Sequence, residues 1–137
     1  MTRAFADTSF YQALLNPSDA WHAPAVAPSE HLASPIVTTE FVLIELGALM
    51  SRGYVRQLLV EFVAEIRSDP GTHVVPATGD LVAKGFDLFS ERPDKDWSIT
   101  DCISFVVMRQ MRISDALSCD RHFEQAGFTQ LLRRDSA

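Results

Sequence analysis

Short apolar stretches alternate with longer segments of helical character along this chain, and this alternation limits the folds open to it. Strands are predicted at residues 3–6, 34–38, 72–75, 116–119 and 128–132. Helices are predicted at residues 8–15, from a cap at Thr38 or Thr39 to about 52, and at 54–66, 78–91 and 98–111. Such alternation is typical of an α/β fold, in which a mainly parallel central sheet lies between layers of helices.

Glycine and proline mark two boundaries in this pattern. Residues 20–33 have helical composition but contain Pro24 and Pro28. A proline inside a helix costs on the order of 3 kcal/mol, so we expect a kink or a late start there. Gly53 is expected to end the helix that precedes it.

The length of the chain favours a single domain over residues 1–137, large enough to bury a full core. No apolar run reaches the length of a membrane span, so we expect no membrane partner. The start of the chain lacks the pattern of a secretory signal, because Asp7 follows closely on its one basic residue. Cys102 and Cys119 lie in apolar segments and are expected to be reduced thiols in a cytoplasmic protein.

The net charge of −6 argues against a broad basic surface that would hold nucleic acid by charge alone. It does not exclude a nuclease, because acidic residues that bind metal contribute to the negative count. Arg121 lies close to an acidic candidate in the sequence and could contact a substrate phosphate.

Four carboxylates lie within apolar runs: Asp7, Glu45, Asp101 and Asp120. Ionised carboxylates avoid apolar surroundings unless a cation or a set of hydrogen-bond donors meets them. Asp7 and Asp120 follow predicted strands, and the carboxyl ends of adjacent parallel strands converge on one crevice. Glu45 and Asp101 lie on helices that could face the same edge. The four acids therefore predict one shared divalent-metal site.

Three of these acids also have a purely structural interpretation. Asp7 could cap the helix that follows it, and Asp101 could complete a capping box with Ser98. Asp120 could be a turn acid. Glu45 has no such alternative, because its helix has no polar stripe near the centre, and its side chain is expected to point into the protein.

Other kinds of site find little support. Four histidines lack the spacing of metal ligands, and only His122, which follows the fourth acid, lies near a candidate site. Ser9 has no histidine–acid partnership, so a serine hydrolase is not indicated. The chain has no glycine-rich phosphate loop.

Taken in order, four segments resemble the PIN-domain family, and within it the VapC-type toxin ribonucleases. They are FADTSF at 5–10, TTEFVLIE at 38–45, WSITDC at 97–102 and LSCDRHF at 117–123. The resemblance implies a three-layer α/β/α fold and a site for Mg²⁺ or Mn²⁺ held by Asp7, Glu45, Asp101 and Asp120. It further implies that Ser9 supports the first acid or a substrate phosphate, and that the Thr100 hydroxyl stands beside the third acid.

The resemblance also implies a function: a metal-dependent endoribonuclease, the toxin of a type II toxin–antitoxin pair. Its partners would be an RNA substrate, a small antitoxin protein and a second copy of the chain. Clustered oxygen ligands suit Mg²⁺ and Mn²⁺, which assist in-line attack on a phosphodiester. An alternative is a catalytically weak PIN-like module that binds RNA or protein. Relatives usually have an uninterrupted helix where Pro24 and Pro28 stand, which leaves the geometry of that region open.

Overall fold

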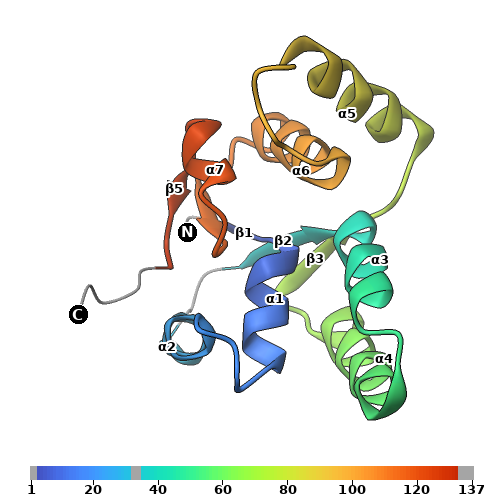
Figure 1. Cartoon of the computed structure of the whole chain (residues 1–137), viewed down its shortest axis with the longest axis vertical. Helices are drawn as coiled ribbons and strands as arrows, with labels where there is room; N and C mark the ends of the chain where they lie inside the picture. Colours follow the sequence, from blue (N-terminus) through green and yellow to red (C-terminus); the bar gives the residue numbers. More distant parts are fainter. Residues whose placement is uncertain (1–2, 32–34, 133–137) are drawn as a thin grey trace.

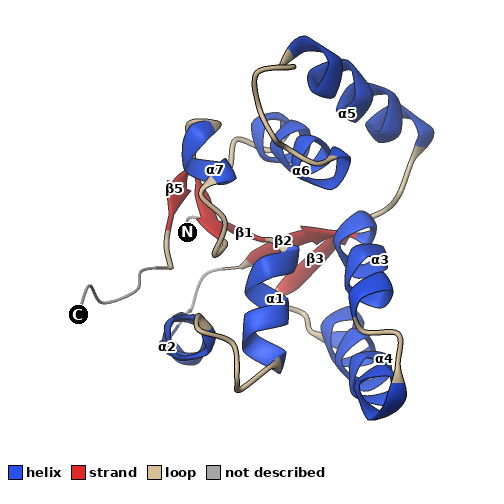
Figure 2. Ribbon diagram, in the orientation of Figure 1, coloured by secondary structure: helices blue, strands red, loops and turns tan. Residues whose placement is uncertain are grey.

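A computed structural model describes residues 3–31 and 35–132, and its centre is a sheet of five strands (Figure 1, Figure 2). The strands are β1 (Ala4–Ala6), β2 (Ile36–Thr39), β3 (Thr72–Val75), β4 (Asp115–Leu117) and β5 (Thr129–Gln130). Their order is β3-β2-β1-β4-β5, and every neighbouring pair is parallel. The predicted α/β class with a parallel central sheet is confirmed.

The first strand, β1, lies in the middle of the sheet, and the later strands lie on both sides of it. The chain moves from β1 to β2 and β3 on one side, then crosses back to place β4 and β5 on the other. Phe5 of β1 therefore pairs with both Val37 of β2 and Ala116 of β4. In open parallel sheets such a reversal opens a crevice at the carboxyl ends of the two strands. The fold thus predicts a site beyond β1 and β4.

Helices cover both faces of this sheet (Figure 2). They are α1 (Thr8–Leu15), α2 (His22–His31), α3 (Glu40–Leu49), α4 (Gly53–Ser68), α5 (Gly79–Glu91), α6 (Ile99–Gln110) and α7 (His122–Gln125). Figure 1 shows α5, α6 and α7 on one side and α1, α2 and α4 on the other. α3 contacts α1, α4 and α6, so it lies at the edge where the two layers meet.

The two prolines do not end α2. The helix begins at His22, later than residue 20, as a late start predicts, and continues through both proline positions to His31. Pro24 lies in the first turn, where a backbone N–H has no intrahelical acceptor to lose.

The predicted end of α3 at Gly53 is wrong. α3 ends at Leu49, and Met50 closes it by donating its backbone N–H to the Leu46 carbonyl. Gly53 instead opens α4, with a positive φ of 61° that glycine adopts without strain. Met50, just past the end of the helix, is also apolar and buried. The sequence pattern therefore gives no sign that the helix ends at Leu49.

An aromatic cluster joins α6 to the strands below it. The Phe105 ring lies 5.0 Å from Trp97, 4.9 Å from Phe123 and 5.6 Å from Phe128, between ring centroids. Phe5 of β1 stacks on Phe123, so the cluster extends to the central strand. These contacts fix α6 and α7 relative to the sheet.

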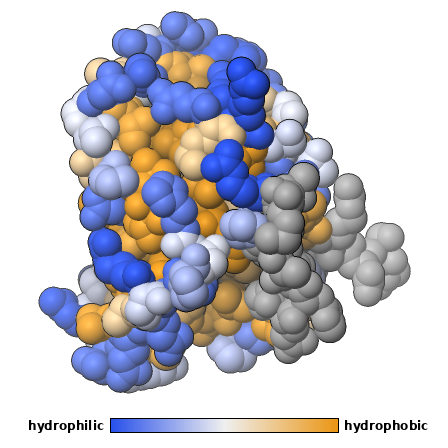
Figure 3. All heavy atoms as spheres, turned by 180° about the vertical axis from the view of Figure 1, so that it is seen from behind, coloured by the Kyte–Doolittle hydropathy of each residue, from blue (hydrophilic) through white to orange (hydrophobic). Residues whose placement is uncertain are grey.

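The surface also carries apolar side chains. Large exposed ones lie on α3, α4 and α5: Ile44, Leu49, Tyr54, Val60, Val82, Phe86 and Phe89. On the face turned away in Figure 1, apolar residues form a broad area framed by hydrophilic ones (Figure 3). Apolar surface of this extent is typical of proteins that bind other proteins. None of the helices within residues 3–31 and 35–132 has the length and apolar character needed to span a membrane.

Candidate metal centre

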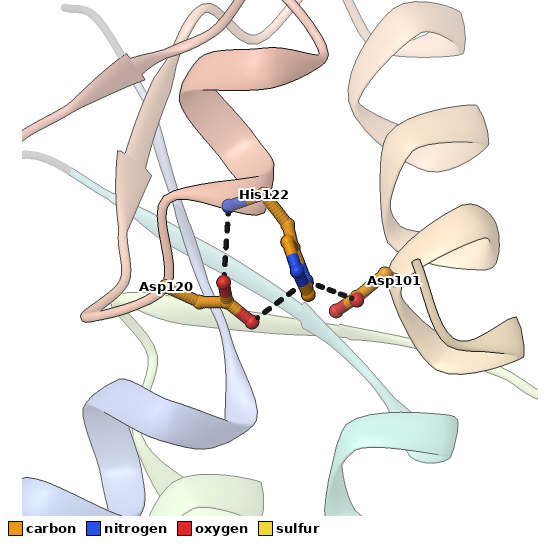
Figure 4. A group of neighbouring side chains, drawn as sticks. All are labelled: Asp101, Asp120 and His122. Carbon is orange, nitrogen blue, oxygen red and sulfur yellow. Dashed lines mark hydrogen bonds and ion pairs between the residues drawn. The ribbon is translucent and has the colours of Figure 1, made fainter. Parts of the chain in front are cut away.

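Three side chains from α6, the loop after β4 and α7 meet beyond the carboxyl end of β4. His122 lies between Asp101 and Asp120, with its Nδ1 3.0 Å from Oδ2 of each (Figure 4). One ligand atom from each residue lies within 4.8 Å of the others. Within the described part of the chain, no other set of three acidic, histidine or cysteine side chains is this close together.

Asp101 is held by the first turn of α6. Its backbone N–H donates to Ser98 Oγ at 3.0 Å, and its Oδ2 accepts the Ser98 backbone N–H at 3.0 Å. The capping box predicted for these residues is therefore present. The same Oδ2 lies against His122, so capping and membership of the cluster occur together.

Asp120 and His122 are positioned by the turn that follows β4. Asp120 Oδ1 accepts the His122 backbone N–H at 3.0 Å, which is the predicted turn contact. The Asp120 backbone N–H in turn donates to Ser118 Oγ at 2.9 Å. This turn brings the His122 ring back over the Asp120 carboxylate and toward α6 (Figure 4).

Asp7 follows β1 directly and is buried, with 3% of its surface exposed. Its Oδ2 accepts hydrogen bonds from Ser9 Oγ at 2.8 Å and Ser118 Oγ at 3.1 Å. It also accepts the Ser9 backbone N–H at 3.4 Å, which is the predicted cap of α1. Asp7 does not belong to the group of three, but Ser118 links it to the Asp120 turn.

The pKa values of two carboxyl groups at this edge are raised, mainly by burial and then by the charge of a neighbouring aspartate. Burial, and then the charge of Asp101, raise the pKa of Asp7 to about 7. Burial raises the pKa of Asp101 as well, and the charge of Asp120 adds to the effect, while hydrogen bonds from Ser98 and His122 oppose it. A cation placed among these groups would remove much of this cost.

Glu45 lies on α3 and is only half-buried. No described residue donates a hydrogen bond to its carboxylate or pairs with it, and it stands outside the group of three. The prediction that its side chain points into the protein is met only in part, because Glu45 is half-buried and Ile44 and Leu49 of the same helix are 65% and 55% exposed. The structure therefore leaves Glu45 without a described partner at the edge where α3 contacts α6.

The supporting residues are placed as follows. Ser9 lies between two parts of the site, because its Oγ donates to Asp7 and accepts the Cys119 backbone N–H at 2.9 Å. Thr100 is half-buried beside Asp101, and its carbonyl accepts the Ser104 hydroxyl. Arg121 is exposed next to Asp120.

Sequence reasoning did not place two residues at the site: His122 and Ser118. His122 was noticed for its position after Asp120, but the spacing of the histidines gave no reason to bring its ring to Asp101, which the long-range contact of α6 with α7 does. Ser118 lies in an apolar run, and its contact with Asp7 depends on the pairing of β1 with β4.

The side chains present fit a divalent cation. The hydrogen bonds from Ser9 and Ser118 to Asp7, and from Ser98 and His122 to Asp101, go to Oδ2, so they leave Oδ1 of each carboxylate available as a ligand. Carboxylate oxygens are the preferred ligands of Mg²⁺, while Mn²⁺ also accepts imidazole nitrogen.

Comparisons with known proteins agree with this arrangement. The family model described as "PIN domain" matches residues 4–129. The 23S rRNA-specific endonuclease VapC20 of Mycobacterium tuberculosis is 32% identical over 127 residues, which are 93% of this chain and 96% of that protein.

Solved structures give the same result. The crystal structure of M. tuberculosis VapC20, described as a sarcin–ricin loop cleaving toxin, matches with a TM-score of 0.84 and 31% identity, covering 92% of this chain and 96% of that one. FitAcB from Neisseria gonorrhoeae has the same fold, with a TM-score of 0.67 at 16% identity and coverage of 93% and 95%. On the family match, the identity to VapC20 and the shared fold, this chain belongs to the PIN domain family.

Proposed function

We propose that this protein is a divalent-metal-dependent endoribonuclease and the toxin of a type II toxin–antitoxin pair. The observation that carries the proposal is the meeting of Asp101, Asp120 and His122 at the reversal of strand order. It occurs in a chain that matches VapC20, an endonuclease, over nearly its whole length. A catalytically weak PIN-like binding module remains the alternative outcome of the test below.

In this proposal, Asp7, Glu45, Asp101 and Asp120 are the acids that hold Mg²⁺ or Mn²⁺. The ion would polarise the scissile phosphate and stabilise charge on the leaving oxygen. Ser9 and Ser118 fix the Asp7 carboxylate by donating to its Oδ2. A carboxylate of this group acts as general base toward the attacking water.

Two exposed or half-buried groups complete the proposed site. Arg121, exposed next to Asp120, supplies a positive charge for a substrate phosphate. The Thr100 hydroxyl, beside Asp101, would orient that carboxylate or a water molecule near it.

The substrate we propose is a structured RNA with an accessible loop. VapC20 is named for 23S rRNA and for the sarcin–ricin loop, so this loop is the first RNA to test. Proteins read RNA sequence mainly in unpaired segments, whose bases can leave the stack.

Protein partners are also part of the proposal. The exposed apolar side chains of α3, α4 and α5 support binding of a small antitoxin and of a second copy of the chain.

The test is cleavage of 23S rRNA and of a sarcin–ricin loop oligonucleotide by wild type and Asp101→Asn, with Mg²⁺, Mn²⁺ or a chelator. We expect cleavage with either ion, none with chelator, and a loss of at least about a hundredfold in the variant. Asp87→Asn changes an exposed acid of α5 and should cut like the wild type.

Calorimetry with Mn²⁺, together with the cleavage assay, distinguishes the ribonuclease proposal from the binding-module alternative. Saturable binding that disappears in Asp101→Asn would assign the carboxylate to the metal. Wild-type protein that binds RNA but cuts none under any metal condition would instead support the binding-module alternative.

A further inference from the structure

A groove of about 640 Å³ opens beside the metal centre, next to β5. It is lined by Trp21 from the turn before α2, by Asp120 and Arg121 after β4, and by Leu132 after β5. We name it the Trp21 groove. Asp120 belongs both to this groove and to the group with Asp101 and His122, so the two sites share a wall.

The lining of the Trp21 groove combines an aromatic ring with polar groups. Trp21 and Leu132 provide apolar surface, Arg121 contributes the one cationic side chain of the described lining, and Asp120 and Glu124 contribute two carboxylates. The volume is within the range of about 300–1,000 Å³ typical of small-ligand sites, so a nucleotide unit can enter. Aromatic rings beside a basic group are what unpaired nucleotides use for stacking and phosphate contact.

The turn that carries Trp21 is held in place by several hydrogen bonds. Asp19 Oδ1 accepts the Trp21 backbone N–H at 2.8 Å, and the Asp19 carbonyl accepts the His22 backbone N–H at 3.0 Å. The His22 ring nitrogen Nδ1 lies 2.8 Å from the Ala13 carbonyl of α1. A ligand that stacks on Trp21 would therefore order little additional backbone, which favours binding.

Ser9 connects the groove to the acids. It lines the groove, and its Oγ contacts both Asp7 Oδ2, at 2.8 Å, and the Cys119 backbone N–H, at 2.9 Å. Because Asp120 belongs to both sites, a phosphodiester bound at Asp101 and Asp120 would place an adjoining nucleotide at the mouth of the groove.

We propose that the Trp21 groove receives the unstacked base of a nucleotide adjoining the scissile phosphate, with Trp21 as its stacking surface. This inference rests on the proposed ribonuclease function and narrows its substrate to RNA that is unpaired at the cut. A base inside a regular helix is already stacked on both sides and cannot enter the groove. Trp21 is thus a specificity-determining residue and takes no part in the chemistry.

Affinity measurements test the requirement for a base. The probes are a fluorescently labelled single-stranded RNA octamer of mixed sequence and an abasic octamer with the same sugar–phosphate backbone. Binding is measured by anisotropy with Ca²⁺ in place of Mg²⁺, and gel electrophoresis checks that the RNA stays intact. Trp21→Ala should weaken binding of the octamer at least about fivefold, and Trp21→Phe should retain most of the affinity. The abasic octamer should bind wild type and Trp21→Ala equally.

Tryptophan fluorescence gives a second, direct readout. The protein has two tryptophans, Trp21 and Trp97, and Trp97 is 3% exposed within the aromatic cluster. We expect the octamer to quench wild-type fluorescence and to leave Trp21→Phe, in which only Trp97 emits, unchanged. The Mn²⁺ affinity of Trp21→Ala is the control for an intact metal site. It should equal that of wild type, whereas a general collapse of the site would lower it.

The outcomes distinguish failure of the groove proposal from failure of the ribonuclease proposal. If Trp21→Ala binds the octamer as tightly as wild type, or if the octamer quenches Trp21→Phe as strongly as wild type, the groove is not a base site. Metal-dependent cleavage of 23S rRNA by wild type would then still support the ribonuclease proposal. If wild type neither binds the octamer nor cuts rRNA, both proposals are overturned.

Discussion

Asp7 and Asp101 use their carboxylate oxygens for different purposes. In Asp7 and Asp101, Oδ2 accepts the hydrogen bonds that cap a helix, and these bonds leave Oδ1 available for a metal ion. This division explains why structural and metal-binding interpretations of one acid are compatible. Capping could be predicted from the sequence because it is local, whereas the approach of Asp101 to His122, 21 residues away, could not.

At this scale, Asp7→Asn should make the metal-free protein more stable at neutral pH. The pKa of Asp7 is raised to about 7 in the fold from 3.8, so the unfolded chain loses the proton first. Wild-type stability therefore falls as pH rises from about 4 to about 7, and the penalty is complete above that range. Asn carries no charge and avoids this penalty, which is on the order of a few kcal/mol.

Denaturant unfolding in chelator at about pH 5 and about pH 8 measures this effect, with Asp87→Asn as the control. The gain of Asp7→Asn should be larger at the higher pH. Equal stability of variant and wild type at about pH 8 would mean that the serine hydroxyls already compensate the charge.

His122→Ala should lower the affinity for Mn²⁺ more than that for Mg²⁺. Nδ1 of His122 lies 3.0 Å from an oxygen of each neighbouring aspartate, and Mn²⁺ accepts nitrogen ligands more readily than Mg²⁺ does. We expect a loss of about tenfold or more for Mn²⁺, measured by calorimetry with each ion. Equal losses of affinity for the two ions would indicate that the His122 ring positions the carboxylates and does not bind the metal.

Among the secondary-structure elements, those with local signals were predicted best. α1 and β3 have the bounds expected from the sequence, because Asp7 caps the first and the turn with Gly71 opens the second. β4 was expected at residues 116–119 but spans Asp115–Leu117. Its register is set by pairing with β1, a strand more than a hundred residues earlier, and this left no local signal.

The contact between α5 and α6 depends on a glycine. A Cβ atom at Gly85 would collide with the Ile103 side chain, which is buried. Gly85→Ala should therefore destabilise the protein by about 1–3 kcal/mol, since packed interiors do not yield easily.

Gly79→Ala, in the first turn of the same helix, is the matched control. A Cβ there meets no atom within 4 Å, so this variant should be neutral or slightly stabilising. Thermal unfolding of both variants decides the point. Equal stability of Gly85→Ala and wild type would show that the two helices can separate slightly without cost.

For the molecule as a whole, the family resemblance predicted the fold class and the order of the acids. It did not predict that Glu45 would be half-buried, without a described partner, on a helix that exposes Ile44 and Leu49. Exposure depends on how α3 packs at the junction of the two layers, and the apolar composition of α3 alone does not reveal it. That residues 1–137 form one domain stays a prediction, which a single cooperative unfolding transition would support.

We expect the wild-type protein to self-associate through the apolar side chains of α3 and the start of α4. Ile44 is 65% exposed and Tyr54 83%, which is unusual for side chains of this size. Ile44→Arg should reduce the molar mass measured by light scattering from that of a dimer to that of a monomer. Gln110→Arg, an exposed polar residue at the end of α6, is the control and should not change it. A monomeric wild type would contradict this prediction.

The separation of β1 and β4 along the chain also has a consequence for synthesis. Translation produces Asp7 early and Asp120 more than a hundred residues later, yet both stand at the junction of these two strands. Until β4 has left the ribosome, the nascent chain has β1 paired on one side at most, and Asp7 lacks its hydrogen bond from Ser118. A ribosome that makes this protein is therefore exposed to a completed nuclease only after β4 has emerged.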